Sequence, residues 1–324
     1  MNYVCLHDKE EIAAALRRDV PLHIYELGDL DDFFWPYTIW FGRSVDGGVA
    51  GGGVAGGGRM TRGAAGGGVS DRRDTAGGDA VTAVTIDATA LLYRGPATPT
   101  LIALSSDAAA VADLLNHIRP VLPVRFHAHL GAGVADALSG DFDLDSHGLH
   151  HKMVLDPAEL PVEIPGTPGN PDTHESRPAL RDTDATDGDF GGAPRSEGAP
   201  RVVRLGRDDI DGLLEFYAEA YPGNWFDPRM LETGRYYGIS NDEGRLISVA
   251  GVHVYSPEYG VAALGNIATA PEYRGRGYGT RVTARLCRDL VDRGLVVGLN
   301  VKADNAAALT SSRRLGFSVV ADYE

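Results

Sequence analysis

The chain has 324 residues, 43% of them hydrophobic, which is enough for about two folded domains. It contains no apolar run near the ~20 residues that span a bilayer, only two cysteines (Cys5 and Cys287), and no basic stripe with interleaved aromatic residues. We therefore expect a cytoplasmic protein that has no disulfide framework and binds neither a membrane nor nucleic acid.

The formal net charge of −15 comes from 45 acidic residues against 30 basic ones, and lysine accounts for only three of the basic residues. The acidic residues are spread along the whole chain. Such a surface keeps proteins soluble in concentrated salt, so the composition resembles that of proteins from halophilic organisms. We read the acidity as salt adaptation, rather than as a surface for a cationic partner.

Residues 1–156 are expected to form an N-terminal α/β domain. Asp8 precedes a predicted helix with an acidic first turn. The runs "YTIWFG", "AVTAVTIDATALLY" and "TLIALS" predict strands. Apolar residues at helical spacing from Val111 to Ile118 then predict a second helix, followed by strands at "VRFHAHL" and "GLHHKMVL".

Two segments have compositions that disfavour a packed core. Residues 47–78 contain 14 glycines and no aromatic residue, which predicts a disordered insertion between two strands. Residues 157–200 mix eight prolines with Gly, Asp and Thr, which predicts a linker between domains.

Residues 201–324 are expected to form a second domain. It begins with an apolar helix face between Ile210 and Tyr221, and Asp227 can cap a further helix. The β-rich runs "GRLISVAGVHVYS" and "GVAALGNIAT" predict an antiparallel hairpin. A glycine loop, a helix over about 278–293, a strand at "LVVGLNV", a short helix from about 306 and a strand at "GFSVVADYE" follow.

The glycine loop "APEYRGRGYGT" (270–280) places three glycines at alternate positions before a predicted helix. Glycines let successive N–H groups converge, and a helix N-terminus adds positive charge, so this pattern is typical of a phosphate site. A Walker loop requires a lysine, and none occurs between residues 153 and 301. A dinucleotide-binding loop requires G-x-G-x-x-G, and residues 305–324 are too few for the rest of its sheet. That hypothesis is the least favoured one.

Two motifs at a fixed separation carry a family resemblance. Arg274-x-x-Gly277-x-Gly279 matches R/Q-x-x-G-x-G/A, the pyrophosphate loop of the GNAT superfamily of acyl-CoA-dependent N-acetyltransferases. Further on, Asn305 and Ala308 match its N-x-x-A positions, and "LGF" (315–317) matches its L-G-F ending. Over residues 201–324 the chain therefore resembles a GNAT acetyltransferase.

The same resemblance implies a fold. It is an α/β (α+β) fold with a mixed, largely antiparallel sheet flanked by helices. The front half, with "LHIYELGDLDDFFWPYTIWFG", resembles the N-terminal halves of two-domain GNAT proteins. Because it lacks the glycine loop, it is expected to be a degenerate GNAT-like domain. Only about one strand follows Phe317 in this sequence, whereas the family normally has a further strand near this end. Either the sheet is short, or another segment completes it, and the N-terminal domain is a candidate.

The resemblance implies acetyl-CoA as the acyl donor. In the family, the strands before the loop and after the helix splay apart around the pantetheine arm, and a backbone N–H polarises the thioester carbonyl. The residues that the resemblance assigns to the cofactor are Ile267, Ala268, Thr269, Arg274, Gly275, Arg276, Gly277, Tyr278, Gly279, Thr280 and Asn305.

The amine that attacks the thioester must first lose a proton to a base. His253, on the strand before the hairpin turn, and Glu258, at the turn, are the candidates. Ser312 stands where the family often has a tyrosine that protonates the leaving thiolate. A serine is a weaker acid, but a thiolate can leave unassisted because thiols ionise near ~8.5. The residues expected to line the acceptor pocket are Tyr217, Tyr221, Trp225 and Phe226.

The sequence thus predicts an N-acyltransferase that acetylates a small-molecule or peptide amine. The alternative is a non-catalytic acyl-CoA-binding or regulatory module, motivated by Ser312 and by the absence of an obvious base. No metal site is expected, since the histidines at 147, 150 and 151 have no cysteine partner.

Overall fold

A computed structural model describes residues 1–46, 84–162 and 200–324. The predicted insertion (47–78) lies outside these residues, and so does most of the predicted linker (157–200). In the described part of the chain, no helix is long and apolar enough to cross a membrane.

Twelve strands in the described residues form two sheets. The five-stranded sheet has the order β1-β2-β3-β4-β5 and the seven-stranded sheet has the order β12-β6-β11-β10-β9-β8-β7. The strands of the first sheet are β1 (Asn2–Leu6), β2 (Thr38–Asp46), β3 (Val84–Tyr93), β4 (Thr100–Ala103) and β5 (His127–Leu130). Those of the second sheet are β6 (His150–Leu155), β7 (Val202–Leu205), β8 (Tyr236–Ser240), β9 (Leu246–Ser256), β10 (Val261–Thr269), β11 (Val296–Lys302) and β12 (Phe317–Tyr323).

Six α-helices pack on these sheets in the described residues. They are α1 (Lys9–Leu16), α2 (Ile24–Gly28), α3 (Ala108–Ile118), α4 (Ile210–Ala220), α5 (Tyr278–Val291) and α6 (Ala306–Arg314). All neighbouring strands pair antiparallel except β4 with β5 and β10 with β11. The expected mixed, largely antiparallel α/β fold is therefore confirmed.

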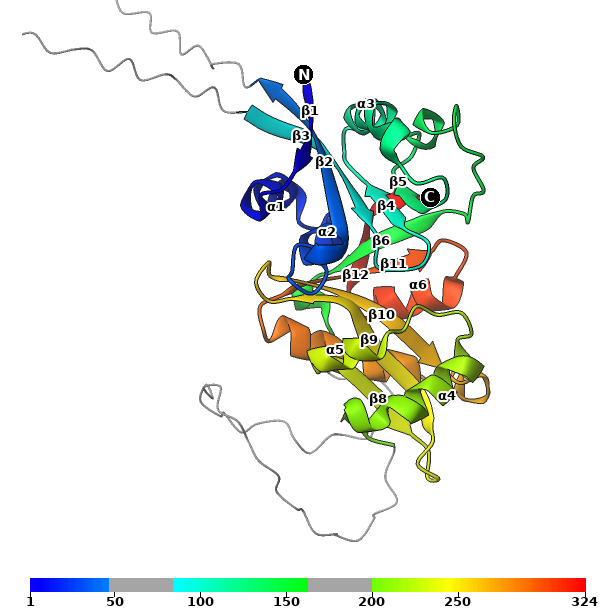
Figure 1. Ribbon diagram of the computed structural model, residues 1–324. Helices are drawn as coiled ribbons and strands as arrows, with labels where there is room; N and C mark the ends of the chain where they lie inside the picture. The colour runs from blue at the N-terminus through cyan, green and yellow to red at the C-terminus, as the bar shows by residue number, and fades with distance from the viewer. Residues whose placement is uncertain (47–83, 163–199) are drawn as a thin grey trace, which may run out of the picture.

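The chain follows the same path twice. In both β1–β5 and β7–β11, three antiparallel pairings lead to one parallel pair, and a helix connects the two parallel strands (α3 or α5). We call the elements from β1 to β5 the N-terminal repeat and those from β7 to β11 the C-terminal repeat. Figure 1 shows the first in blue to green and the second mainly in yellow and orange.

Strand β6 joins the two repeats. Although it follows β5 in the chain, it lies between β11 and β12 and pairs antiparallel with both (Figure 1). The expected boundary after residue 156 therefore does not separate the two sheets. Of the two alternatives for the missing strand, the structure has the second: a segment that precedes the linker completes the sheet.

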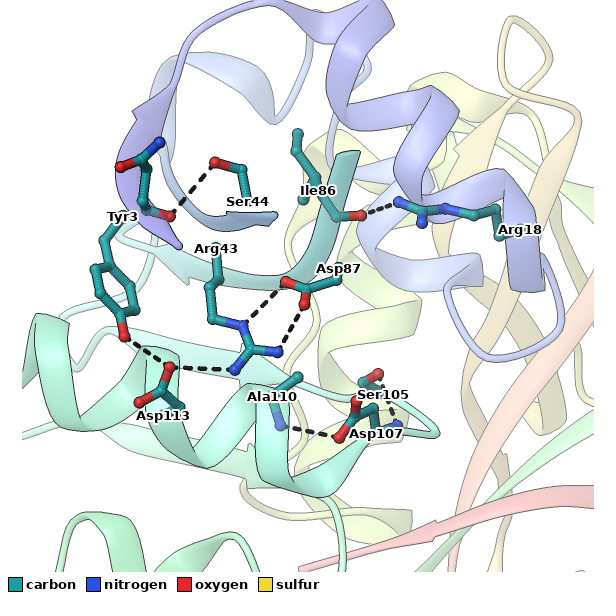
Figure 2. Close-up of polar contacts among 11 residues, drawn as sticks. Tyr3, Arg18, Arg43, Ser44, Ile86, Asp87, Ser105, Asp107, Ala110 and Asp113 are labelled. Carbon is teal, nitrogen blue, oxygen red and sulfur yellow. Dashed lines mark hydrogen bonds and ion pairs between the residues drawn. The ribbon is translucent and has the colours of Figure 1, made fainter. Parts of the chain in front are cut away.

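A network around Arg43 holds α3 against the five-stranded sheet (Figure 2). Arg43 of β2 donates to Asp87 of β3 at 2.6 and 3.0 Å and to Asp113 of α3 at 3.1 Å. Tyr3 of β1 donates to the same Asp113 at 2.6 Å. The bidentate guanidinium–carboxylate geometry fixes direction as well as distance, so three strands and one helix keep a single arrangement.

The junction between the repeats combines an apolar core with a buried ion pair. Leu6, Ile12 and Trp40 share a core with Val254 and Val261. Within the described residues of this region, Lys152 of β6 donates to the backbone carbonyl of Leu22 at 2.6 Å and to Glu26 of α2 at 3.2 Å. Burial would raise the pKa of Glu26, but the Lys152 ammonium and His23 lower it to about 2. The pair therefore fixes α2 against β6.

We predict that Lys152→Met destabilises the protein by about 3–5 kcal/mol, since it leaves a buried carboxylate without its partner. Chemical denaturation at neutral pH measures this loss. The double variant Lys152→Met/Glu26→Gln should recover part of it. Because the folded-state pKa of Glu26 lies below the ordinary value of about 4.3, its contribution is present above pH 4.3 and is lost as the pH falls towards about 2. Equal stability of Lys152→Met and the parent protein at pH 7 would contradict this account.

Candidate functional site

Strands β10 and β11 pair along only part of their length. Their parallel ladder runs from Val261–Val296 to Leu264–Leu299 and then stops. Strand β10 nevertheless continues to Thr269 and β11 to Lys302. The other edge of β11 stays paired with β6 through Lys302. The two strands therefore open a wedge, as the family resemblance implies.

Two irregularities in the β9–β10 hairpin lie beside this wedge. His253 is an extra residue of β9, between the pairs Val254–Ala263 and Val252–Leu264. In β10 the pairing shifts again between Gly265 and Ala268, so Asn266 and Ile267 both lie opposite one residue of β9. Bulges of this kind interrupt the ladder and redirect side chains. Here they take backbone groups at 266–267 out of the sheet at the wedge.

The conformation of Asn266 is held from several sides. Its φ is 53°, the one positive value at a non-glycine residue in the described part of the chain. Tyr217 donates to its backbone carbonyl at 2.7 Å, and its side-chain amide donates to Tyr236 Oη at 3.0 Å and to the Trp225 carbonyl at 3.2 Å. Strained backbone persists where its surroundings determine it this strongly, and such places are often functional.

A cavity of about 970 Å³ fills the wedge and extends to the N-terminal repeat. This volume lies in the range of small-molecule and cofactor sites. On the side of the seven-stranded sheet its walls include Tyr221, Trp225, His253, Gly265, Asn266, Ile267, Asn300, Asn305 and Ser312. From the N-terminal repeat they include Tyr25, Asp29, Phe34, Tyr93, Thr100, His127 and His129.

His253 combines access to the cavity with the properties of a base. Its ring lies 5.5 Å from the Trp225 ring, edge to face, and over Gly265, where a Cβ would collide with it. Its Nε2 atom is buried, and no hydrogen-bond partner for it exists among the described residues. Burial lowers the pKa of His253, and the Asn266 side chain opposes this shift. The imidazole is therefore neutral near pH 7 and can accept a proton.

Asn300 provides a second unsatisfied group. It lies on the stretch of β11 that faces the wedge, and its Oδ1 is buried without a partner in the described structure. Buried polar atoms are nearly always hydrogen-bonded in native proteins. An unpaired acceptor at this place is able to accept from an N–H or O–H group of a ligand.

The glycine loop lies at one end of the wedge. Gly275 and Gly277 have φ of 75° and 81°, and Gly277 begins α5 without a side-chain cap. The first N–H groups of a helix have no partner within it, which makes this end an anion site. A Cβ on either glycine would meet no atom of the protein within 4 Å. The space in front of the loop is thus open to a ligand.

The arginines of the loop have different roles. Arg274 donates through Nε to the Thr269 carbonyl at 3.0 Å and through its terminal nitrogen to the Ala220 carbonyl at 3.2 Å. It therefore ties the loop to β10 and α4. Arg276 is exposed, and its guanidinium lies 5.3 Å from the centroid of the Tyr273 ring. Of the two, Arg276 is the one whose charge is available to an anion.

Helix α6 closes the wedge. The Asn305 side chain caps it by accepting from the Ala308 N–H at 3.1 Å, and both residues line the cavity. Thr280 at the start of α5 and Ser311 share a hydrogen bond of 2.8 Å between their hydroxyls. Ser312 is buried and lines the cavity, as expected from its position on the helix.

Some predicted residues lie elsewhere. Glu258 is exposed at the β9–β10 turn, the opposite end of the hairpin from the glycine loop, and it does not line the cavity. Tyr217 is part of the core of the seven-stranded sheet, and Phe226 packs against that core. Only Tyr221 and Trp225 of the four aromatic residues reach the cavity. The expected acceptor cluster is therefore divided between core and site.

Sequence reasoning missed the wall that the N-terminal repeat contributes, including Asp29 and Tyr93. Nothing in the local pattern around these residues distinguishes them, because the contact joins segments far apart in the chain. It also missed Asn266 and Asn300. A signal existed for both, since each is a lone amide inside an apolar strand run.

The described residues of the N-terminal repeat form no equivalent site of their own. Strands β4 and β5 pair along the whole of β4, from Thr100–His127 to Ala103–Leu130. The short connection to α3 ends at Asp107, whose carboxylate accepts from the Ala110 N–H at 2.9 Å (Figure 2). That carboxylate stands where an anion would bind and repels one. The expected degeneracy of this domain therefore has a structural cause.

Comparisons with known proteins agree with this arrangement. The family model described as "Acetyltransferase (GNAT) family" matches residues 207–317. Mycothiol acetyltransferase of Tsukamurella paurometabola is 39% identical over 107 residues, which are 32% of this chain and 37% of that protein. The chain thus spans just over a third of that relative.

With two further proteins, the match extends over more of the other protein's length. N-alpha-acetyltransferase RimI of Mycobacterium tuberculosis is 34% identical over 131 residues, which are 37% of this chain and 78% of that protein. A tandem GNAT protein from the clavulanic acid biosynthesis pathway superposes with a TM-score of 0.51 over 99% of this chain and 96% of its own, at 15% identity. This likeness concerns the fold alone. By its motifs, its wedge and its relatives, the chain belongs to the GNAT family of acetyltransferases.

Proposed function

We propose that this protein is an N-acetyltransferase that transfers the acetyl group of acetyl-CoA to an amine, with one active centre in the C-terminal repeat. The observation that carries the proposal is the wedge between β10 and β11, with an uncapped helix N-terminus at one end and a bulge beside His253 at the other. Relatives that are named acetyltransferases support acetyl as the acyl group.

The residues of the wedge fit acetyl-CoA in three respects. The loop of Gly275, Gly277 and Gly279 and the N–H groups of Tyr278 and Thr280 offer donors to a pyrophosphate. Ile267–Thr269 and the facing edge of β11 present strand edges to the amides of pantetheine. The unpaired Oδ1 of Asn300 can accept from one of those amides, and Asn305, at the start of α6, lines the same cavity.

Acetyl-CoA supplies an activated acetyl group as a thioester. In the proposed reaction, His253 accepts a proton from the amine, directly or through water, which frees the nitrogen lone pair for attack. Backbone N–H groups at the bulge stabilise negative charge on the carbonyl oxygen. A C–N bond forms and the C–S bond breaks, and the proton that the nitrogen loses in this step passes to the leaving thiolate through the Ser312 hydroxyl or through water.

A second candidate is a non-catalytic acyl-CoA-binding module. Ser312, in place of a stronger acid, is the observation that favours it. A screen of amines, amino acids and peptide N-termini against acetyl-CoA, with free CoA as the readout, separates the two functions. The cytoplasmic location and the salt-adapted origin stay predictions from composition.

We predict that Gly277→Val weakens CoA binding at least tenfold in calorimetry, because the side chain enters the open space in front of the loop. Gly244→Val is the matched control. The φ of Gly244 is 82°, close to the 81° of Gly277, and a Cβ there also meets nothing within 4 Å, but Gly244 lies in the β8–β9 turn. Both variants should lose similar thermal stability, and only Gly277→Val should lose CoA. Unchanged CoA binding in Gly277→Val would contradict the loop assignment.

We predict that His253→Ala lowers kcat by about 10²–10⁴, the range of general-base catalysis, without changing CoA affinity. Since burial lowers the pKa of His253, the rate of the parent enzyme should rise with pH through a value below the ordinary 6.5 or so, and His253→Ala should lack that limb. Glu258→Gln should behave like the parent. The opposite assignment follows if Glu258→Gln loses activity and His253→Ala does not.

We predict that Trp225→Ala raises the acceptor KM and leaves CoA affinity unchanged, because Trp225 lines the cavity away from the glycine loop. Phe226→Ala, one residue along, should lower the melting temperature instead, since its ring packs between Tyr217 and Tyr236 at 5.1 and 5.7 Å. If Trp225→Ala destabilises the protein and keeps the parent KM, Trp225 has a core role.

A further inference from the structure

The wall that the N-terminal repeat contributes to the cavity contains a carboxyl group without a partner. Asp29 ends helix α2, is 7% exposed, and lines the cavity. No hydrogen bond or ion pair reaches its carboxyl among the described residues. Glu26, one turn earlier on the same helix, has both Lys152 and His23 as partners. The two buried acids therefore differ: Glu26 is neutralised by partners within the fold, and the carboxyl of Asp29 is available to a ligand.

Packing fixes Asp29 at this place. Helix α2 lies against β9 and β10 of the C-terminal repeat. A Cβ on Gly28 would collide with Val254, the residue after His253. The end of α2 can approach β9 this closely only because residue 28 is glycine, so Asp29 stands next to the strand that carries the proposed base.

Aromatic rings that share the cavity with Asp29 form a chain leading to His253. The ring centroids of Phe34 and Tyr93 lie 6.0 Å apart, those of Tyr93 and Trp225 6.4 Å, and those of Trp225 and His253 5.5 Å, all edge to face. Burial raises the pKa of Tyr93 to about 12, and the charge of Asp29 adds to this shift.

A buried carboxyl with no partner is unfavourable in an empty site, and burial raises the pKa of Asp29 well above its usual value. A ligand cation would remove this penalty. Ring faces and a single carboxylate are together the groups that recognise an ammonium ion in a partly dry pocket. Neutral or anionic ligands would gain nothing comparable from these residues.

We propose that Asp29, with Phe34, Tyr93 and Trp225, forms the subsite that binds an ammonium group of the acceptor. The inference rests on the proposed acetyltransferase function and assigns its acceptor class: amines that carry a positive charge into the cavity. The ammonium is either the group that is later deprotonated and acetylated or a second charge on the same molecule. The N-terminal repeat, which has no cofactor loop, thus supplies the acceptor side of the site.

The test is calorimetry on the full chain saturated with CoA, which holds no acetyl group and so permits no turnover. The probes are 1,5-diaminopentane, 1-aminopentane and 5-amino-1-pentanol. We expect the parent protein to bind the diamine and Asp29→Asn to bind it at least tenfold more weakly. Asp32→Asn is the matched control, because Asp32 is three residues away, 94% exposed in its side chain, and outside the cavity.

The probes distinguish the two sources of the charge. A loss confined to the diamine means that Asp29 holds a second ammonium group, and an equal loss for all three amines means that it holds the attacking one. Asp29→Asn should keep or raise the melting temperature, since it removes an acid that has no partner. A lower melting temperature would reveal a structural role and overturn the inference.

Two other results would also overturn it. One is equal amine affinity in Asp29→Asn and the parent protein. The other is the absence of amine binding in a protein that does bind CoA, which would leave the proposed acetyl transfer intact. If CoA itself failed to bind, both the proposed function and this inference would be wrong.

Discussion

The parting of β10 from β11 after Leu264 is the constraint on which the rest of the structure depends. Strands that stop pairing leave backbone groups without hydrogen-bond partners. Neighbouring elements on both sides of the wedge stabilise the two strands. Strand β6 keeps the far edge of β11 paired to its end. On the near side, Tyr217 and Tyr236 hold the Asn266 bulge in a backbone conformation that would otherwise be unfavourable. The wedge is thus an open site inside an otherwise complete sheet.

The two repeats differ in the features to which we assign cofactor binding, because one repeat has these features and the other lacks them. The C-terminal repeat has a wedge, a bulge and a glycine loop at a free helix end. In the N-terminal repeat the strands stay paired, and Asp107 caps α3 with a negative charge. Its remaining contribution is spatial: it leads into β6, which completes the other sheet, and it places the end of α2 and Tyr93 on the cavity wall.

Features set by neighbouring residues were predictable from the sequence, and features set by distant contacts were not. Motif spacing predicted the glycine loop, α5, β11 and α6, because capping and helical periodicity act within a few residues. The strand at "GLHHKMVL" was predicted, but its place between β11 and β12 depends on long-range pairing. The sequence of the hairpin did not favour either His253 or Glu258 as the base. The structure distinguishes the two candidates, because the bulge in β9 lies at His253, beside the wedge. Asp29 is one of several acids in its segment of the sequence, and only the packing of α2 on β9 and β10 places it at the cavity.

In the proposed function, the C-terminal repeat binds acetyl-CoA and the N-terminal repeat does not. Hydrogen–deuterium exchange of the full chain, with and without acetyl-CoA, can distinguish the two repeats, since backbone N–H groups are the proposed contacts. We expect slower exchange at residues 265–269 and 275–281 when acetyl-CoA is present, and no change at residues 104–110. Protection at 104–110, or none in the wedge at saturating acetyl-CoA, would contradict it.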